Sequence, residues 1–308
     1  MIPAYNEEDN IPAIIKRLSA LTDSLMHTYD FEFLLLDNCS TDKTPQLAKK
    51  QAEIDKRWKY LRYSRNFGSE ASIAAGFDHC IGDAAILVFS DLQDPPEKIP
   101  EMLQIWEGGV DVVYGVVRNR RDSSWLKTLG ARLAYRLIYH LTDFNIPPDG
   151  TDFRLLDRKV IDALRCMREP DRYYRGLVHW VGFRQRSFVY DRAPRVKGKS
   201  NASLSHCVYF AFHAIFCFSS APMRLSLIFG LSLTILSIAM SIGYVILFFV
   251  RPSFMNPPPP GLTTVVILAL FLVGTNSFFL GLIGEYVGRI YNQGKRRPLY
   301  IVAERVNC

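Results

Sequence analysis

Two long runs of uncharged, mostly apolar residues constrain this chain more than any other feature of its sequence. The first, LSLIFGLSLTILSIAMSIGYVILFFV, covers residues 225–250, and the second, LTTVVILALFLVGTNSFFLGLIG, covers residues 262–284. Each exceeds the roughly 20 apolar residues that cross the hydrocarbon core of a bilayer. The segment RPSFMNPPPPG between them is rich in residues that break helices. The sequence therefore predicts a transmembrane helical hairpin.

Basic residues flank these runs unevenly. Arg224 precedes the first run, and Arg289 and the basic stretch 295–297 follow the second, whereas the connecting segment carries only Arg251. The cytoplasmic flanks of membrane helices carry the excess of Lys and Arg. Both ends of the hairpin, and with them the region that precedes it, are therefore expected on the cytoplasmic side of the membrane.

The aromatic-rich segment LSHCVYFAFHAIFCF, residues 204–218, precedes the first run. It fits an entry helix that lies along the membrane interface, and the alternative is a continuation of the first span. The expected organisation is a cytoplasmic domain over 1–200, an interfacial amphipathic segment over 201–222, a transmembrane helix over 223–250, a non-cytoplasmic loop over 251–261, a second transmembrane helix over 262–288 and a cytoplasmic tail over 289–308. The tail sequence RRPLYIVAE, residues 296–304, suits a strand that pairs either with this domain's own sheet or with a neighbouring chain. The second option would make a homo-oligomer.

The region before the hairpin alternates between two kinds of segment. Short apolar runs rich in strand-forming residues lie at 31–37, 59–64, 84–91 and 110–116, and helix-like segments lie at 10–25, 44–57, 70–80 and 97–107. The first residues, MIPAYNEE, read as the end of one further strand. Alternation at this spacing predicts an α/β fold with a doubly wound, mostly parallel sheet.

Polar residues collect where these strands end. PAYNEE, DNCSTD, RNFGSE, SDLQDPP and VRNRR follow the five expected strands in turn. Any one of them can be an ordinary turn, but five at one edge indicate a ligand site, because ligands of such sheets bind beyond the carboxyl ends of the strands. The formal net charge of +7 favours an anionic partner: nucleic acid, a phosphorylated small molecule or an anionic membrane surface.

The motifs PAYNEE (3–8), DNCSTDKT (37–44), SRNFGSEASIAAGFDHC (64–80) and SDLQDPPE (90–97), in this order, resemble those of inverting family 2 glycosyltransferases of the GT-A type. GTDFRLLDRKVIDAL (150–164) and the hairpin resemble the branch that acts on polyprenyl phosphates, which includes dolichyl-phosphate mannose synthase and bacterial glucosyltransferases. The likeness extends over nearly the whole chain. It implies a GT-A fold followed by a two-helix transmembrane hairpin.

The resemblance implies a nucleotide-sugar donor and assigns residues to it. Pro3, Tyr5 and Glu7 match the family's first nucleotide-contacting loop. Asp37 matches an acid that holds the base or the ribose, and a carboxylate suits the N–H and hydroxyl donors of these groups.

Asp91 and Gln93 match the metal-binding motif of the family, and their oxygen atoms suit Mg²⁺ or Mn²⁺. Such a cation would neutralise charge on the departing nucleotide. The sequence departs from the family at Phe89, where a further acid is usual, and at Asn38, the second position of a usual Asp-Asp pair. Asp91 is therefore expected to be the one strong charge among the protein's metal ligands.

The acceptor that the resemblance implies is a membrane lipid phosphate, whose oxygen is already largely deprotonated at neutral pH. Asp157 is the expected base or acceptor-orienting group, and Asp152 is the second candidate. The alternative role for Asp157 is to cap the helix that follows it. The candidates for binding phosphate are Arg118, Arg154, Arg195 and Ser200, with Lys197 and Lys199 as substitutes because Asn201 and Ala202 depart from the family pattern beside Ser200.

The expected function is the inverting transfer of a hexose, glucose from UDP-glucose, to a polyprenyl phosphate of the undecaprenyl type at the cytoplasmic face of the membrane, with no nucleic-acid partner. Mannose from GDP-mannose and an aminoarabinose donor remain open. A processive polysaccharide synthase is disfavoured, because the sequence has no further spans and no QxxRW motif. A non-catalytic membrane protein that binds nucleotide sugars is a further alternative, motivated by Phe89.

Overall fold

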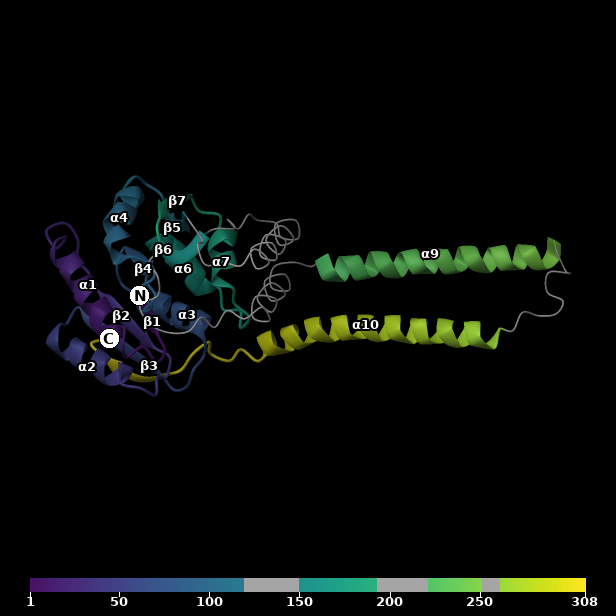
Figure 1. Ribbon diagram of the computed structural model, residues 1–308, viewed down its shortest axis with the longest axis horizontal. Coiled ribbons are helices and arrows are strands. Elements are labelled where there is room, and N and C mark those ends of the chain that lie inside the picture. Colours follow the sequence, from purple (N-terminus) through teal and green to yellow (C-terminus); the bar gives the residue numbers. More distant parts are fainter. Residues whose placement is uncertain (119–149, 193–220, 251–260) are drawn as a thin grey trace. The chain divides into compact units, whose positions relative to one another are not determined.

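The computed structural model describes residues 1–118, 150–192, 221–250 and 261–308 (Figure 1). The chain divides into two compact units, residues 1–218 with 297–308, and residues 219–296. The described strands all belong to the first unit: β1 (Ile2–Ala4), β2 (Phe33–Asp37), β3 (Trp58–Tyr63), β4 (Ala84–Leu87), β5 (Val112–Val117), β6 (Gly150–Asp157), β7 (Gln185–Tyr190) and β8 (Val302–Val306). The described helices of this unit are α1 (Ile11–Asp23), α2 (Thr44–Ile54), α3 (Ser69–His79), the 3-10 turn η1 (Pro96–Lys98), α4 (Ile99–Glu107), α6 (Arg158–Cys166) and α7 (Tyr174–Trp180).

The strands form two four-stranded sheets that Met1 joins. One sheet has the order β1-β2-β3-β8 and the other the order β4-β6-β5-β7. The amino group of Met1 donates to the carbonyl of Ile86 at 2.8 Å, and its own carbonyl accepts from the N–H of Val88 at 3.0 Å. Two bonds from one residue to positions on either side of its neighbour are the pattern of parallel strands. The strands therefore follow one another as β8-β3-β2-β1-β4-β6-β5-β7.

The direction of the strands differs from the prediction in the second half of the sheet. β1, β2 and β3 pair in parallel, as expected, but in the second half β6 pairs antiparallel with both β4 and β5, while β7 is parallel to β5. In the first half, β8 at the edge also pairs antiparallel with β3. The prediction of a mostly parallel sheet is therefore wrong for the second half, and the sheet is mixed. The GTDFRLLD run has the composition of a strand, but composition carries no information on strand direction.

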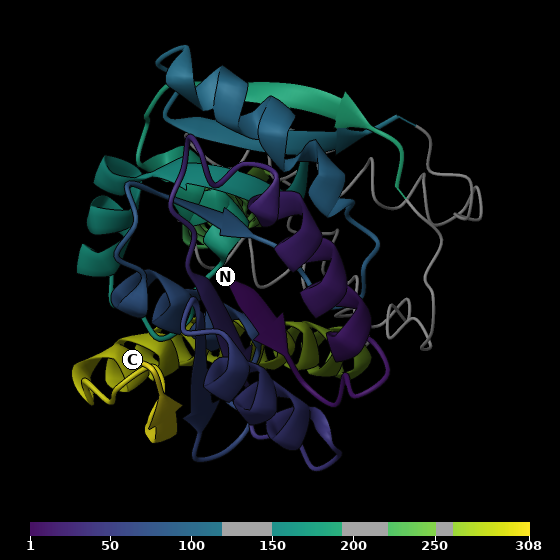
Figure 2. The ribbon, with the colours of Figure 1, turned by 90° about the vertical axis from the view of Figure 1, so that its left-hand side faces the viewer.

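Helices cover both faces of the sheet, which confirms the doubly wound arrangement (Figure 2). One core cluster takes its helical residues from α1, α2 and α4, and the other takes them from α3, α6 and α7. The apolar positions of these helices recur at helical spacing, as Ile11, Ile14 and Leu18 do in α1, so each helix buries one face. Proline in the first turn of α1, α2 and α4 suits a helix start, where its missing N–H is not needed.

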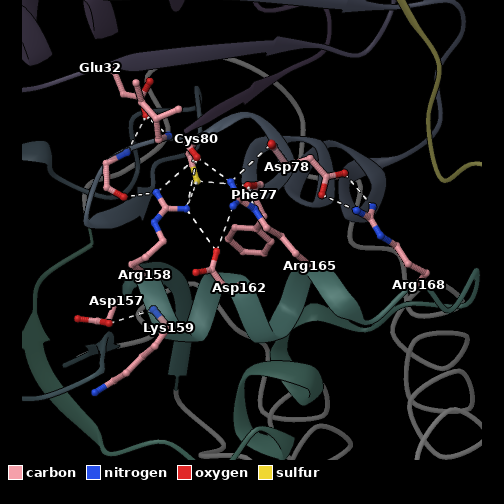
Figure 3. Close-up of polar contacts among 12 residues, drawn as sticks. Glu32, Phe77, Asp78, Cys80, Asp157, Arg158, Lys159, Asp162, Arg165 and Arg168 are labelled. Atoms are coloured by element: carbon pink, nitrogen blue, oxygen red, sulfur yellow. Dashed lines mark hydrogen bonds and ion pairs between the residues drawn. The ribbon is translucent and has the colours of Figure 1, made fainter.

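Arginine side chains of α6 hold the end of α3 at the amino-end edge of the sheet (Figure 3). Arg165 donates from Nε to the carbonyl of Phe77 at 2.6 Å and from Nη2 to the carbonyl of Cys80 at 2.7 Å. Arg158 donates to the same Cys80 carbonyl at 3.4 Å. The last carbonyls of a helix have no partner within the helix and carry partial negative charge, so cations there stabilise it. This cluster is structural.

Replacing Arg165 by alanine is expected to lower the free energy of unfolding by about 2 kcal/mol, because two charge-assisted hydrogen bonds to partly buried carbonyls are lost. The matched control is Arg168→Ala. Arg168 pairs with Asp78 at 2.8 Å but is largely exposed, so its loss is expected to cost under about 1 kcal/mol. Denaturant titration of both variants in detergent measures the difference. Equal losses would contradict the structural role given to Arg165.

The second unit consists of the helices α9 (Ala221–Val250) and α10 (Leu262–Gly294). The rings of Phe229 and Phe279 lie 6.1 Å apart between the two helices. Taken over the residues that the structure describes, no helix combines the length and the apolarity of a membrane span. The expected interfacial segment, 204–218, lies outside the described residues.

The tail after α10 returns to the first unit and pairs with its own sheet. β8 lies antiparallel to β3, with Val302 opposite Tyr63 and Val306 opposite Tyr60. The hydroxyl of Tyr300 donates to Asp78 at 2.9 Å. Of the two options that the sequence left open, the structure has the pairing within the chain. The homo-oligomer stays a prediction, and the pairing of the tail does not support it.

Candidate active site

The neighbours β1 and β4 form the topological switch point of the sheet. β2 and β3 follow β1 on one side, and β6, β5 and β7 follow β4 on the other. Ligands of doubly wound sheets bind beyond the carboxyl ends of the strands at this point. The hydroxyl of Ser90 donates to the carbonyl of Pro3 at 3.2 Å and ties the two strand ends together. The loops after β1, β2, β3 and β4 thus gather at one edge, as the sequence predicts.

Asp37, the last residue of β2, lies beneath this edge. Its side chain is fully buried, and its carboxylate accepts from the N–H of Ser40 at 2.8 Å and from the hydroxyl of Tyr60 at 2.7 Å. Burial, followed by the bond to Asp37, raises the pKa of Tyr60 well above its usual value. Asp37 therefore fixes the conformation of the loop after β2 through the N–H of Ser40.

Asn38 explains one departure from the family pattern. Its amide nitrogen donates to Oδ1 of Asn66 at 2.9 Å, and its amide oxygen accepts from the N–H of Phe67 at 2.8 Å. Oδ1 of Asn66 also accepts from the N–H of Gly68 at 2.9 Å. A carboxylate at position 38 could accept but not donate. Asparagine thus joins the loop after β2 to the loop after β3 in a way that aspartate cannot.

The loop after β1 presents Tyr5 and Glu7 at the edge. Tyr5 is 47% exposed, whereas Pro3 is buried within β1. The carboxylate of Glu7 accepts from the side chain of Asn10 at 2.6 Å. The backbone N–H of Asn6 donates to the hydroxyl of Ser40 at 2.9 Å, so this loop is hydrogen-bonded to the loop after β2. Of the predicted nucleotide contacts on this loop, Tyr5 is the side chain most open to solvent.

The predicted metal motif turns sharply at Leu92. This residue has a φ of 55°, in the left-handed region, yet it is only 2% exposed. A leucine in this conformation costs on the order of 1–3 kcal/mol and persists only where the surroundings fix it. The buried side chain fixes one side of the turn, and Asp91 fixes the other by accepting from the N–H of Gln93 at 3.2 Å. Asp91 and Gln93 are thereby half-buried neighbours at the switch point.

Asp94 follows this turn and is buried. It accepts from the hydroxyl of Tyr190, at the end of β7, and forms an ion pair with Arg192 at 3.3 Å. Burial raises the pKa of Asp94, and the charges of Asp91 and Asp152 add to this, while Arg192 opposes it. Asp94 therefore connects the turn after β4 to the end of β7.

Asp152 lies at the start of β6, which is at the same edge because β6 runs antiparallel to β4. Its two carboxylate oxygens accept from Nε and Nη2 of Arg175, on α7, at 2.6 and 2.7 Å. Burial alone would raise the pKa of Asp152, but Arg175, with Arg154 and Arg192 beyond it, lowers it. The carboxylate is thus held ionised in a bidentate pair next to Asp94.

Asp157 lies at the opposite edge. The register sets it against Ala84, the first residue of β4, and α6 follows it directly. Its carboxylate accepts from the indole N–H of Trp106 at 2.8 Å and from the N–H of Lys159 at 3.1 Å, and Figure 3 shows it beside α6. The geometry therefore gives Asp157 the capping role and does not bring it to Asp91. The carboxylate of β6 that reaches the site is Asp152.

The predicted phosphate-binding residues divide in three ways. Arg154 is 1% exposed, within the sheet between the rings of Tyr114 and Tyr174 at 5.8 and 5.6 Å, so it does not reach the edge. Burial lowers its pKa. Arg118 follows β5, is exposed and lies 3.8 Å from Asp191. Arg195 and Ser200, with Lys197 and Lys199, lie outside the described residues.

Sequence reasoning missed several charged residues of this site. Asp94 was present in the SDLQDPP motif, but its position after Gln93 suggested only a turn. Glu70 stands in the RNFGSE stretch at the expected ligand edge, but it was given no role of its own. Arg175 and Arg192 come from α7 and the end of β7, and no local pattern relates them to Glu70. The sequence does hint at Arg175: in YYRGL a basic residue stands among apolar ones, which suggests a buried ionic partner. Its partner can be found only from the fold.

The family model described as "Glycosyl transferase family 2" matches residues 1–165. An uncharacterized glycosyltransferase of Synechocystis sp. is 37% identical over 99% of this chain and 94% of its own length. The bactoprenol glucosyl transferase of Shigella phage SfV is 32% identical over 98% of this chain and 96% of its own length.

Among solved structures, a glucosyl-3-phosphoglycerate synthase from Mycobacterium tuberculosis, in complex with Mn²⁺, UDP and phosphoglyceric acid, has a TM-score of 0.46 and 20% identity over 70% of this chain and 74% of that chain. The family match covers β1 to β6, the turn after β4 and all of α6 except its last residue. On the family model and the full-length relatives, the chain belongs to glycosyl transferase family 2 and is a glycosyltransferase with the GT-A fold.

Proposed function

We propose that this chain transfers a hexose, glucose from UDP-glucose, with inversion to the phosphate of an undecaprenyl-type polyprenyl lipid at the cytoplasmic face of a membrane. The 32% identity to a protein named as a bactoprenol glucosyl transferase, over nearly the full length of both chains, supports this acceptor and this sugar. The products are the polyprenyl-phosphate sugar and the nucleoside diphosphate.

One observation carries the proposal. The chain leaves the described part of the first unit after β7 and re-enters it before β8, and both points lie at the carboxyl-end edge of the sheet. β7 ends there because it is parallel to β5, and β8 begins there because it is antiparallel to β3. The same edge carries Asp91, Asp94 and Asp152. The described chain therefore leaves and re-enters the first unit at the edge of the sheet that carries the proposed site.

We place the membrane at α9 and α10 on the full sequence of each, which includes positions whose side chains the structure does not describe. Their sequence runs 225–250 and 262–284, taken in full, carry no charge. α9 has 30 residues and α10 has 33, and a 30-residue helix is about 45 Å long, more than the roughly 30 Å of a hydrocarbon core. The proposed boundaries are those expected from the sequence: spans over 223–250 and 262–288, a non-cytoplasmic loop over 251–261, an interfacial segment over 201–222, and cytoplasmic parts over 1–200 and 289–308.

The donor site is proposed at the loops after β1 and β2. Tyr5 offers an exposed ring for the base, and the polar loop that Asp37 supports from below offers backbone and side-chain groups for the ribose. Because Asp37 is buried and already accepts two hydrogen bonds, we give it a role in shaping this loop. Glu7 and Pro3 complete the loop at its other side.

A divalent cation, Mg²⁺ or Mn²⁺, fits the donor set of the turn after β4. Asp91 and Gln93 offer only oxygen ligands, which both cations prefer. Over the described ranges, no three His, Cys, Asp or Glu side chains gather as a closed metal site, which suits a cation that takes most of its ligands from phosphate and water. When bound, it would supply positive charge to the departing diphosphate. The strained turn at Leu92 fixes the backbone that carries Asp91 and Gln93.

The acceptor phosphate needs orientation more than a base, because its oxygen is already ionised at neutral pH. We give the acceptor-orienting role to Asp152, through the Arg175 guanidinium that it fixes, in place of Asp157. Arg118 is a proposed phosphate contact at the end of β5, and Arg195 and Ser200 stay proposed contacts on sequence grounds. Arg154 supports Asp152 from within the sheet, since alternation along β6 sets both on one face.

The test is transfer of labelled glucose from UDP-glucose to undecaprenyl phosphate by the purified full chain in detergent, with parallel reactions containing GDP-mannose. The label is expected in the lipid phase with UDP-glucose and to disappear on chelation of divalent cations. Label from GDP-mannose alone would overturn the choice of sugar. Absence of transfer from either donor to lipid phosphate would overturn the proposed function.

A further inference from the structure

Glu70 reaches from one helix to the start of another. It lies in the first turn of α3, and its carboxylate Oε2 accepts from the backbone N–H of Tyr174 at 2.8 Å. Tyr174 is the first residue of α7, whose preceding residue, Tyr173, provides no side-chain cap. The first N–H groups of a helix have no partner within it. Glu70 therefore satisfies from outside a donor that α7 does not satisfy itself.

The next residue of α7 is Arg175, which holds Asp152 with two short hydrogen bonds. The position of that guanidinium depends on where α7 begins. α7 has only 7 residues, so a shift of its first residue also displaces Arg175. A contact at Tyr174 thus bears directly on the Asp152–Arg175 pair.

We propose that Glu70 is a positioning residue for sugar transfer: by holding the first N–H of α7 it sets the Asp152–Arg175 pair at the acceptor side of the site. This inference rests on the proposed function and adds a residue that neither the family motifs nor the comparisons assign. Glu70 acts through the backbone of Tyr174 and need not touch either substrate.

The charges around Glu70 make this contact sensitive to pH. The groups that face it are Asp152 on β6, Arg172 before α7 and Arg175 on α7, together with the N–H of Tyr174. Burial raises the pKa of Glu70 to about 7; Asp152 adds to the rise, and the N–H of Tyr174 and the two arginines oppose it. An ionised carboxylate is a stronger acceptor than a protonated one. Transfer is therefore expected to rise with pH as Glu70 ionises near neutrality.

Stability is expected to move the other way. A carboxyl group whose pKa is raised on folding binds its proton more tightly in the folded chain than in the unfolded chain. Its contribution to stability is therefore present at low pH and falls as the pH rises from the ordinary value of 4.5 to about 7. A purely structural glutamate would give no reason for activity to rise over the range in which stability falls.

The experiment compares Glu70→Gln and Glu70→Ala with the full wild-type chain, using UDP-glucose and undecaprenyl phosphate in detergent. Glu70→Gln keeps an acceptor oxygen and is expected to lose the part of the pH profile near 7 that belongs to Glu70. Any limb that remains belongs to other groups, among them the lipid phosphate and Asp94. Glu70→Ala is expected to lower kcat/KM for the lipid by roughly 10-fold to 100-fold, with KM for UDP-glucose unchanged. Amide hydrogen exchange over residues 174–180 is expected to accelerate in Glu70→Ala.

The matched control is Glu101→Gln. Glu101 also lies in the first turn of a helix, α4, but it is half-exposed and pairs with Lys98 at 2.8 Å, so the pH profile of Glu101→Gln should equal that of the wild type. If both Glu70 variants kept wild-type transfer, pH profile and exchange, the inference would be overturned while the proposed function stood. If the wild type itself transferred no sugar, the proposed function would fail instead, and the exchange measurement would still test the contact with α7.

Discussion

Replacing Asp91 by alanine is expected to lower kcat for sugar transfer by about 10²-fold to 10³-fold, the range seen when one electrostatic stabiliser of a transition state is removed. Asp91 is the only carboxylate of the proposed cation ligands, so its loss leaves Gln93 as the one remaining protein ligand of that pair. The measurement is single-turnover transfer of labelled glucose at saturating donor. The dependence on Mg²⁺ or Mn²⁺ concentration is expected to weaken with it.

Asp162→Ala is the matched control for the Asp91 substitution. Asp162 is an exposed carboxylate of α6 that pairs with Arg165 at 3.0 Å, at the edge of the sheet away from the site. It should leave kcat unchanged. Full activity and an unchanged metal dependence in Asp91→Ala would contradict the proposal that the cation binds at the turn after β4.

Substitutions at the two ends of β6 are expected to have opposite effects. Asp152→Asn should lower kcat by about 10²-fold, because Arg175 loses its charged bidentate partner and the acceptor is misplaced. Asp157→Ala should leave kcat unchanged and lower the free energy of unfolding by about 1 kcal/mol, the usual value of a lost helix cap. The two variants, measured for transfer and for denaturant unfolding, separate the site from the cap.

The reverse outcome would return the acceptor role to Asp157. A loss of transfer in Asp157→Ala with a normal unfolding curve, together with a fully active Asp152→Asn, would contradict the register argument. Arg175→Lys gives an independent check, because lysine keeps the charge but lacks the planar fork that binds both carboxylate oxygens. It should impair transfer like Asp152→Asn.

The local elements of the first unit could be predicted because they are written in short stretches of sequence. The helix expected over 44–57 is α2, at Thr44–Ile54, and the strand expected over 110–116 is β5, at Val112–Val117. The mixed half of the sheet could not be predicted. It depends on β6 entering between β4 and β5, and pairing between segments some 70 residues apart leaves no mark in either segment.

The same reason explains why the sequence favoured Asp157 over Asp152. Asp152 and Asp157 are equally good carboxylates in one strand, and only the antiparallel register of β6 decides which of them lies at the edge that carries Asp91. The turn after β4 was accessible from sequence because Asp91 and Gln93 stand within three residues of each other. Glu70 and Arg175 were not, because their relation passes through a backbone N–H of Tyr174, which every non-proline residue carries.

The pairing of β8 with β3 also bears on how the protein is made. β3 occupies residues 58–63 and β8 residues 302–306, so a ribosome completes both long helices before it delivers the strand that covers this edge. Until then β3 exposes its unpaired N–H and C=O groups, which invite pairing with other chains. The catalytic unit of a nascent chain is therefore incomplete for most of its synthesis. Synthesis of α9 and α10 and completion of the sheet are therefore consecutive events.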